Sequence, residues 1–197
     1  MSLTPPEGDF RFIALDVETA NGDSASICQI GLACVGWDRE ILTWSTHVHP
    51  DMDFAAFNIR LHGIGPETVR DAPAFPETWG RLRPLLARHP MVQHSRFDEN
   101  ALRAACEHHH LPRPRLAWTD SVMVARHAWP ELKGAGGGGH GLGNLKKALG
   151  LSFRHHDAGE DARAAAEVVL RAEPVLGSRF AKLTGIPTAR QLNLPFD

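Results

Sequence analysis

The chain has 197 residues, of which 43% are apolar and 22% are charged, and these values are ordinary for one globular domain with a sizeable core. The formal net charge of −2 argues against a broad electrostatic grip on nucleic acid, although it allows a few local contacts. No apolar run approaches about 18 residues, and the N-terminus lacks the basic and apolar segments of a signal peptide. Together with three cysteines that show no CxxC spacing, these features predict a cytoplasmic protein with no membrane partner.

The first part of the chain predicts strands. Residues 11–18, 27–36 and 41–48 are apolar or alternating runs rich in isoleucine, valine, leucine, threonine and tryptophan. The short break between the second and third runs has turn composition, so we expect three consecutive strands in an antiparallel meander. A connection punctuated by prolines follows them.

The rest of the chain alternates helices with short strands. Asp157 and Glu160 form an aspartate variant of the capping box, which places His156 just outside the last helix and Asp161 in its second turn. Strands followed by alternating elements predict an α/β domain with a mixed five-stranded sheet and helices on both faces. The expected helices cover residues 76–88, 97–110, 120–129, 142–149 and 158–173, and the expected strands cover 91–94 and 115–119.

Four carboxylates occupy places where the surrounding pattern is apolar. Asp16 and Glu18 end the first strand, and because they are two residues apart their side chains point to the same face. Asp98 and Asp161 lie on the apolar stripes of two helices that we expect to pack on the sheet. A buried carboxylate is costly unless it is compensated, so four that converge indicate a site for divalent cations. Oxygen ligands suit Mg²⁺ or Mn²⁺ better than zinc.

A histidine near the last acid completes a candidate catalytic site. Two hard cations about 3.5–4 Å apart are a common arrangement for phosphodiester hydrolysis, because one activates the attacking water and the other stabilises the leaving oxygen. His156 lies in a loop five residues before Asp161, and an imidazole has a pKa near the working pH. The pattern therefore predicts a two-metal hydrolase in which His156 accepts the proton of the water.

Three segments, in this chain order, resemble the motifs of the DEDD exonuclease superfamily. They are Asp16-Val17-Glu18-Thr19, Phe97-Asp98 and His156-Asp157-Ala158-Gly159-Glu160-Asp161. The spacing of the last motif is that of the histidine branch, DEDDh, and the tyrosine branch is excluded because the chain has no tyrosine. The resemblance covers residues 10–173 and includes three supporting segments, which are Cys28-Gln29-Ile30-Gly31, His62-Gly63-Ile64 and Leu142-Gly143-Asn144-Leu145.

The resemblance implies a ribonuclease H-like fold and an enzyme that removes nucleoside monophosphates from 3′ ends. It implies that His156 is the general base, with His155 as a rival whose spacing to Asp161 is one residue too long. The two metal ions, Mg²⁺ or Mn²⁺, would bind to Asp16, Glu18, Asp98 and Asp161. The terminal nucleotide would contact Thr19, Ala20, His62 and Ile64.

One motif departs from the family pattern. Relatives often have His-Asn ahead of the Phe-Asp pair, whereas this chain has Gln93-His94 ahead of Phe97-Asp98. The metal ligand of this motif is therefore carried over, but the substrate contacts of the His-Asn pair are not.

The end of the chain carries a separate candidate motif. We divide the chain into an exonuclease domain, residues 1–177, and a tail, residues 178–197. The tail either folds back on the domain or, by its Gln-Leu-x-Leu-Pro-Phe segment, resembles the short peptide by which bacterial proteins dock on the DNA sliding clamp. In that hypothesis Gln191 bonds in a small pocket, while Leu194 and Phe196 fill an apolar groove.

We interpret the chain as a bacterial 3′–5′ exonuclease that acts on DNA and is similar to the proofreading, or epsilon, subunits of replicative polymerases. A ribonuclease of the same superfamily, trimming RNA or short oligoribonucleotides, is the first alternative, because the sequence does not show how the site treats a 2′-hydroxyl. A non-catalytic module that binds the clamp or a polymerase is the second alternative. The presence of all four acids and the histidine argues against it.

Overall fold

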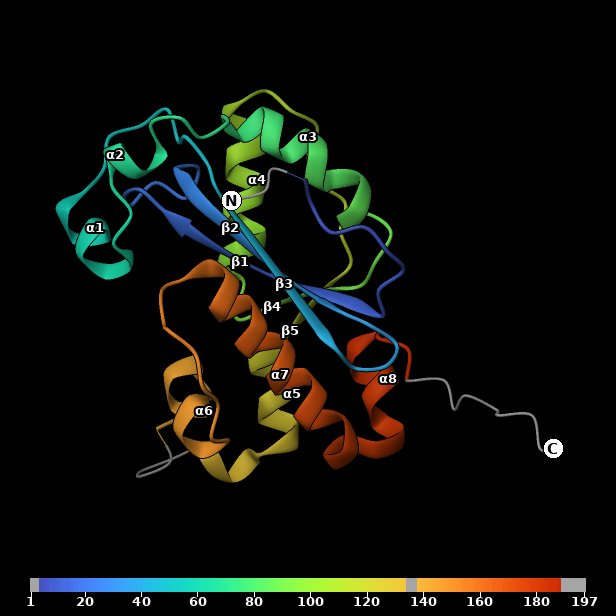
Figure 1. The fold of residues 1–197 in the computed structure, drawn as a ribbon. Coiled ribbons are helices and arrows are strands. Elements are labelled where there is room, and N and C mark those ends of the chain that lie inside the picture. Colours follow the sequence, from blue (N-terminus) through green and yellow to red (C-terminus); the bar gives the residue numbers. More distant parts are fainter. Residues whose placement is uncertain (1–3, 134–137, 189–197) are drawn as a thin grey trace.

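The structure is a computed structural model that describes residues 4–133 and 138–188. A five-stranded sheet in the order β3-β2-β1-β4-β5 forms its centre (Figure 1). The β1–β2 and β2–β3 pairs are antiparallel, whereas β4 runs parallel to both β1 and β5, so the mixed sheet is confirmed. The strands are β1 (Phe12–Thr19), β2 (Ile27–Val35), β3 (Ile41–His47), β4 (Met91–Gln93) and β5 (Trp118–Asp120).

Helices cover both faces of this sheet, as expected. In Figure 1, α3 and α4 lie on one side of the strands, and α5 and α7 lie on the other. The helices are α1 (Ala56–His62), α2 (Pro66–Val69), α3 (Phe75–Leu86), α4 (Phe97–His108), α5 (Ser121–Ala128), α6 (Leu142–Ala148), α7 (Ala158–Leu176) and α8 (Phe180–Thr184), with short 3₁₀ turns at Pro130–Leu132 and Gly177–Arg179.

The alternation of side chains along β1 decides which residues reach which face. Odd-numbered residues such as Ile13 pack with the helices α3 and α4 in one core. Even-numbered residues such as Ala14 pack with α5 and α7 in a second core. Asp16 and Glu18 continue the even series, so the strand directs both carboxylates to the face that α7 covers. Because β1 is central and buried on both faces, its sequence is a nearly continuous apolar run.

The differences from the expected elements have simple causes. Helices α1 and α2 fill the proline-rich connection, where no helix was predicted. Helix α1 has only seven residues and buries none of them, so its sequence lacks the longer apolar periodicity of a helix packed on the sheet. Strand β5 covers Trp118–Asp120 rather than 115–119, and Asp161 lies in the first turn of α7 rather than the second.

The segment after α7 packs against the domain. Phe180 of α8 and Ile186 are both fully buried, in the core that also contains α5 and α7. Residues 178–188 therefore fold back on the rest of the structure, and the division at residue 177 stays a prediction. Within the described residues, no helix combines the length and the apolar character that crossing a membrane requires.

Candidate active site

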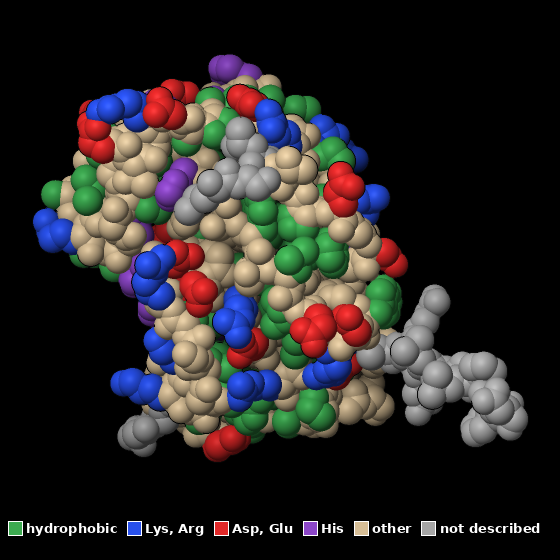
Figure 2. Space-filling model, in the orientation of Figure 1, with side chains coloured by type: hydrophobic (Ala, Val, Ile, Leu, Met, Phe, Trp, Pro, Cys, Tyr) green, Lys and Arg blue, Asp and Glu red, His purple; other side chains and the backbone are tan. Residues whose placement is uncertain are grey.

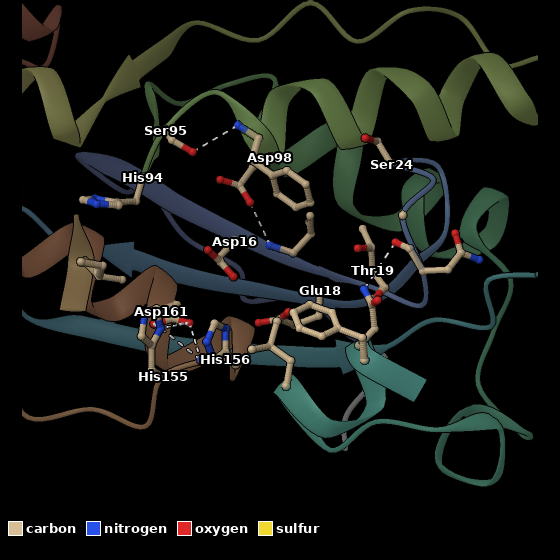
Figure 3. A pocket seen from close by; sticks show the side chains of 18 residues that line it. Asp16, Glu18, Thr19, Ser24, His94, Ser95, Asp98, His155, His156 and Asp161 are labelled. Atoms are coloured by element: carbon tan, nitrogen blue, oxygen red, sulfur yellow. Dashed lines mark hydrogen bonds and ion pairs between the residues drawn. The ribbon is translucent and has the colours of Figure 1, made fainter. Parts of the chain in front are cut away.

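A cavity of about 550 Å³ lies where β1 ends (Figure 3). Segments that are far apart in the sequence form its walls: the end of β1 and the loop after it, α1, the N-terminal end of α4, and the loop that leads into α7. All four sequence-predicted acids and both adjacent histidines line it, which are Asp16, Glu18, Asp98, Asp161, His155 and His156.

Three of the acids meet because α7 approaches the sheet closely. Asp16, Glu18 and Asp161 each bring one carboxylate oxygen to within 4.8 Å of the others. Gly31 of β2 is the cross-strand partner of Asp16, and its missing side chain leaves room for the first turn of α7. The side chain of Gln29, also in β2, accepts the backbone N–H of Ala158 at 3.1 Å and so holds the beginning of the helix.

Asp98 reaches the same place from α4. Strand β4 pairs with β1 only alongside Ile13 and Ala14, so the backbone N–H of Val17 lies beyond the parallel ladder. The carboxylate of Asp98, which is 1% exposed, accepts this N–H at 3.0 Å. Figure 3 shows Asp98 and Asp161 on opposite sides of Asp16.

Gln93 fixes the helix that carries Asp98, and the sequence analysis missed this role. Arg96, the N-cap residue of α4, forms no side-chain cap bond. Instead the amide oxygen of Gln93, a 2% exposed residue of β4, accepts the N–H of Glu99 at 2.9 Å in the first turn of α4. Gln93, which departs from the His-Asn pattern, thus caps α4 from the neighbouring strand β4.

Burial, and then neighbouring negative charges, opposes the ionisation of Asp16, Glu18 and Asp98. Burial, and then the charges of Asp98, Asp161 and Glu18, raises the pKa of Asp16 well above its ordinary value. Burial, and then the charge of Asp161, raises the pKa of Glu18 to about 7. The pKa of Asp98 is raised by burial, although the N–H of Val17 offsets part of this increase. An all-oxygen cluster with this excess of negative charge fits divalent cations, which would neutralise it.

We expect the stability of the metal-free protein to fall as the pH rises above about 6.5. Between its ordinary pKa of 4.5 and its folded pKa of about 7, Glu18 binds more protons in the native state than in the unfolded state, so its contribution decreases as the pH rises. Asp98, whose pKa is raised to about 8, extends this loss above pH 7, and the raised pKa of Asp16 acts in the same direction. Histidines with lowered pKa values, such as His94, act in the opposite direction, but only below their ordinary value of 6.5.

Mn²⁺ should therefore raise the melting temperature more at about pH 8 than at about pH 6.5. At the higher pH more of the carboxylates are ionised, and the bound ions neutralise their charge. Thermal melting at both pH values, with and without millimolar Mn²⁺, measures this difference. An equal shift at both values would contradict a cluster of acids with raised pKa values.

Both histidines lie beside Asp161, but in a different arrangement from the one expected from spacing. The Nδ1 atom of His155 lies 3.0 and 3.1 Å from the two oxygens of Asp161, whereas His156 donates its backbone N–H to Asp161 Oδ2 at 2.7 Å. The two rings stack, with their centroids 4.2 Å apart. His156 has a φ of 65°, and this turn of the chain allows the earlier histidine to reach the acid. Burial, and then His155, lowers the pKa of His156, which favours a neutral ring.

The residues expected to contact the nucleotide do not all face this cavity. Thr19 lines it, whereas Ala20 is fully buried. His62 Nε2 lies 3.1 Å from the carbonyl oxygen of Thr19, and His62 Nδ1 accepts the N–H of Ile64 at 3.0 Å. His62 and Ile64 line a neighbouring hollow of about 420 Å³, so they support Thr19 from outside the acid cavity.

Exposed apolar side chains form part of the cavity wall, and the sequence analysis did not single them out. Phe57 and Leu61 of α1 are 65% and 41% exposed, and Phe97 of α4 is 46% exposed. A signal was present in α1, where two apolar residues lie four apart on a helix with no buried face. The candidate clamp residues Gln191, Leu194 and Phe196 lie outside the described residues.

This fold and this arrangement of acids define a class of protein, the nucleases with a ribonuclease H-like fold. The sequence matches the RNase_T exonuclease family over residues 13–169, and the chain therefore belongs to this family. The expected resemblance to DEDDh-type 3′–5′ exonucleases is confirmed, as are the expected fold and the prediction of an enzyme.

The curated relatives are much longer than this chain. The PolC-type DNA polymerase III of Streptococcus pneumoniae strain D39 is 26% identical in an alignment of 188 residues that covers 93% of this chain but 12% of the polymerase. The PolC-type polymerase of Caldanaerobacter subterraneus subsp. tengcongensis is 25% identical in an alignment of 165 residues that covers 82% of this chain and 11% of the polymerase.

Two solved structures with the same fold are similar in size to this chain. Exonuclease X in complex with 5′ overhanging duplex DNA has a TM-score of 0.66 at 22% identity, covering 89% of this chain and 98% of that chain. The nuclease domain of 3′hExo, a DEDDh family member bound to rAMP, has a TM-score of 0.70 at 16% identity, covering 92% of this chain and 96% of that chain.

Proposed function

We propose that the chain hydrolyses DNA from the 3′ end and releases nucleoside 5′-monophosphates. The main support is the meeting of Asp16, Glu18 and Asp161 within 4.8 Å, beside Asp98 and two imidazoles, in an open cavity. The PolC-type relatives are DNA polymerases, and Exonuclease X was solved with DNA, which favours DNA as the substrate. The bacterial origin of these polymerases also supports the prediction of a cytoplasmic protein.

Different groups of the chain have different roles in the proposed reaction. Two divalent ions, Mg²⁺ or Mn²⁺, would bind to Asp16, Glu18, Asp98 and Asp161, activate the attacking water and stabilise the leaving oxygen. His156 accepts the proton of the water at a ring nitrogen. The N–H groups of His156 and Val17 hold the carboxylates of Asp161 and Asp98 in place.

The substrate is held by local contacts rather than by a basic surface. Figure 2 shows basic and acidic side chains interspersed on the visible face, in agreement with the net charge of −2. Thr19 contacts the terminal nucleotide directly, while Ala20, His62 and Ile64 shape and support the segment that presents Thr19. A strand end that enters a cavity needs few phosphate contacts, so a weakly charged enzyme suffices.

An assay on matched oligonucleotides tests the substrate. DNA and RNA strands of the same sequence, each labelled near its 5′ end, are incubated with the protein and Mg²⁺ or Mn²⁺. We expect a ladder of shortened DNA products and slower shortening of RNA. Faster shortening of RNA would favour the alternative, a ribonuclease, which the complex of 3′hExo with rAMP brings into consideration. No shortening of either strand would favour a non-catalytic binding module.

Replacing His156 by alanine should lower kcat by about 10²–10⁴-fold, the usual contribution of a general base. Binding of Mn²⁺, measured by the shift in melting temperature, should persist because the four acids remain. The matched change His155→Ala should cost less in kcat. The opposite order of the two losses would make His155 the base, and a change confined to KM would assign His156 a positioning role.

The clamp hypothesis is tested by removing residues 191–197. The full chain should co-elute with a bacterial sliding clamp, and the shortened chain should elute separately, because Gln191, Leu194 and Phe196 are missing. Exonuclease activity on short DNA should not change, since the buried anchors Phe180 and Ile186 are retained. Co-elution of the shortened chain would exclude this peptide as the docking element.

A further inference from the structure

The loop that leads into α7 brings two imidazoles to one carboxylate. His155 Nδ1 lies 3.0 Å from Asp161 Oδ1, and the rings of His155 and His156 are stacked. A potential ligand atom from each of these three residues lies within 4.8 Å of the other two. Nitrogen donors distinguish this cluster, which we call the histidine cluster, from the all-oxygen group of Asp16, Glu18 and Asp161.

The donor types decide which ion each group prefers. Mg²⁺ and Mn²⁺ favour oxygen ligands, whereas imidazole nitrogens favour Zn²⁺ and other first-row transition metals. Two histidines and one carboxylate, with a fourth position open to water, are a common zinc ligand set. The side chain of His155 is 43% exposed and that of Asp161 is 5% exposed, so an ion has access from solvent on one side and meets a buried carboxylate on the other.

We propose that His155, His156 and Asp161 form a transition-metal site that takes Zn²⁺ and differs from the two-cation site described above. The N–H of His156 holds Asp161 Oδ2 at 2.7 Å and fixes the carboxylate of this site. The ring planes are 2° from parallel, and the lone pair of an imidazole nitrogen lies in its ring plane. Binding therefore requires one ring to rotate toward the ion, and this is the exposed ring of His155.

Zinc bound at the histidine cluster inhibits the enzyme, a consequence that rests on the proposed function. The ring nitrogen of His156 that would coordinate zinc can then no longer accept the proton of the water. The zinc ion also competes with Mg²⁺ or Mn²⁺ for the carboxylate of Asp161. Inhibition by zinc therefore depends on His155, a residue that takes no part in the proposed proton transfer.

The binding site is tested directly on the full chain after removal of metal. Zinc affinity is measured by competition with a chromogenic chelator, and the visible absorption of Co²⁺ reports nitrogen coordination. His155→Gln removes one proposed ligand, and His155→Asn is a second variant of the same kind. Asp16→Asn alters only the all-oxygen group, and His127→Gln removes an exposed histidine of α5 as a matched control.

We expect zinc affinity to fall by about tenfold or more in both His155 variants, because a lost ligand costs at least as much as a lost outer-shell partner. The affinity of Asp16→Asn and His127→Gln should stay close to that of the unmodified chain. Loss of binding in Asp16→Asn together with full binding in His155→Gln would overturn the proposal, because the ion would then lie among the acids.

Inhibition is measured as the zinc concentration that halves DNA hydrolysis in Mg²⁺, with each variant normalised to its own zinc-free rate. This concentration should rise about tenfold or more in His155→Gln, in step with the lost affinity, and stay unchanged in His127→Gln. Weak zinc binding with undiminished inhibition in His155→Gln would overturn the inhibitory role. If the unmodified chain fails to hydrolyse DNA without zinc, the proposed function fails, while the binding experiment still decides whether the site exists.

Discussion

Asp16→Asn should lower kcat by at least about 10³-fold, because metal ions supply several kcal/mol of charge stabilisation and each 1.36 kcal/mol is worth a factor of ten. Asp16 is the acid whose pKa is raised by all three of the others, and it therefore lies at the centre of the cluster. The amide keeps the size of the side chain but removes its charge. It should therefore weaken the binding of both proposed ions while leaving the fold intact.

The same variant should be more stable than the unmodified chain when metal is absent, at about pH 8. Burial, and then the charges of three neighbouring acids, makes the ionised form of Asp16 unfavourable, and asparagine removes this charge from the native state. This difference in stability should disappear when Mn²⁺ is added, because the ions bind the unmodified chain more tightly than the variant and so stabilise it more. Loss of activity and gain of metal-free stability in one variant is a combination that ordinary structural damage does not produce.

Hydrolysis of labelled DNA and thermal melting with and without Mn²⁺ measure both effects. Asp71→Asn is a suitable control, because Asp71 is exposed and lies outside the acid cavity. It should change neither quantity. If Asp16→Asn digests DNA at the rate of the unmodified chain, the assignment of this cavity as the active site is wrong.

The acids could be found from the sequence because their surroundings obey simple periodicities. Asp16 and Glu18 follow a strand alternation, and Asp98 and Asp161 follow helical stripes whose other members are buried in the structure. The capping role of Asp157, whose side chain accepts the N–H of Glu160, was also visible in the sequence and is confirmed. These features are local, and local spacing was enough to predict them.

Three features that depend on contacts between one element and the next, rather than on spacing within an element, were not predicted. The contact of His155 with Asp161 arises from the positive φ of His156, which spacing alone does not reveal. The cap that Gln93 provides connects a strand to the following helix through a side chain. Helix α1 was missed because none of its residues is buried, and its side chains Asn58 and His62 instead contact the carbonyl oxygen of Thr19. In each case tertiary contacts outweigh local propensity.

Gly31→Ala should damage both the fold and the site, because the backbone of α7 lies against this position. A Cβ atom at Gly31 would lie 2.1 Å from both the carbonyl carbon and oxygen of Ala158, and 2.3 Å from the nitrogen of Gly159. These are backbone atoms, so no change of rotamer relieves the overlap, and the first turn of α7 must move. Overpacking of this kind costs about 1–3 kcal/mol, or roughly 2–12 °C in melting temperature for a chain of this size.

The loss of activity in Gly31→Ala should exceed what this loss of stability explains. Asp161 lies on the turn of α7 that is displaced, whereas Asp16 stays on β1, so the two acids move apart. A displacement of about 1 Å in a catalytic group can cost about 10²-fold in rate. The assay is therefore run well below the melting temperature, where the variant is fully folded, and the Mn²⁺ concentration for half-maximal rate is measured as well.

Gly80→Ala provides the matched control for this change. Gly80 is an exposed residue inside α3, and no atom lies within 4 Å of the Cβ that alanine would add. This substitution should raise stability by about 0.4–1 kcal/mol through the unfolded state and leave the rate unchanged. A Gly31→Ala variant that melts, binds Mn²⁺ and hydrolyses DNA like Gly80→Ala would show that the close approach of α7 to β2 does not position Asp161. The convergence of the acids would then need another cause.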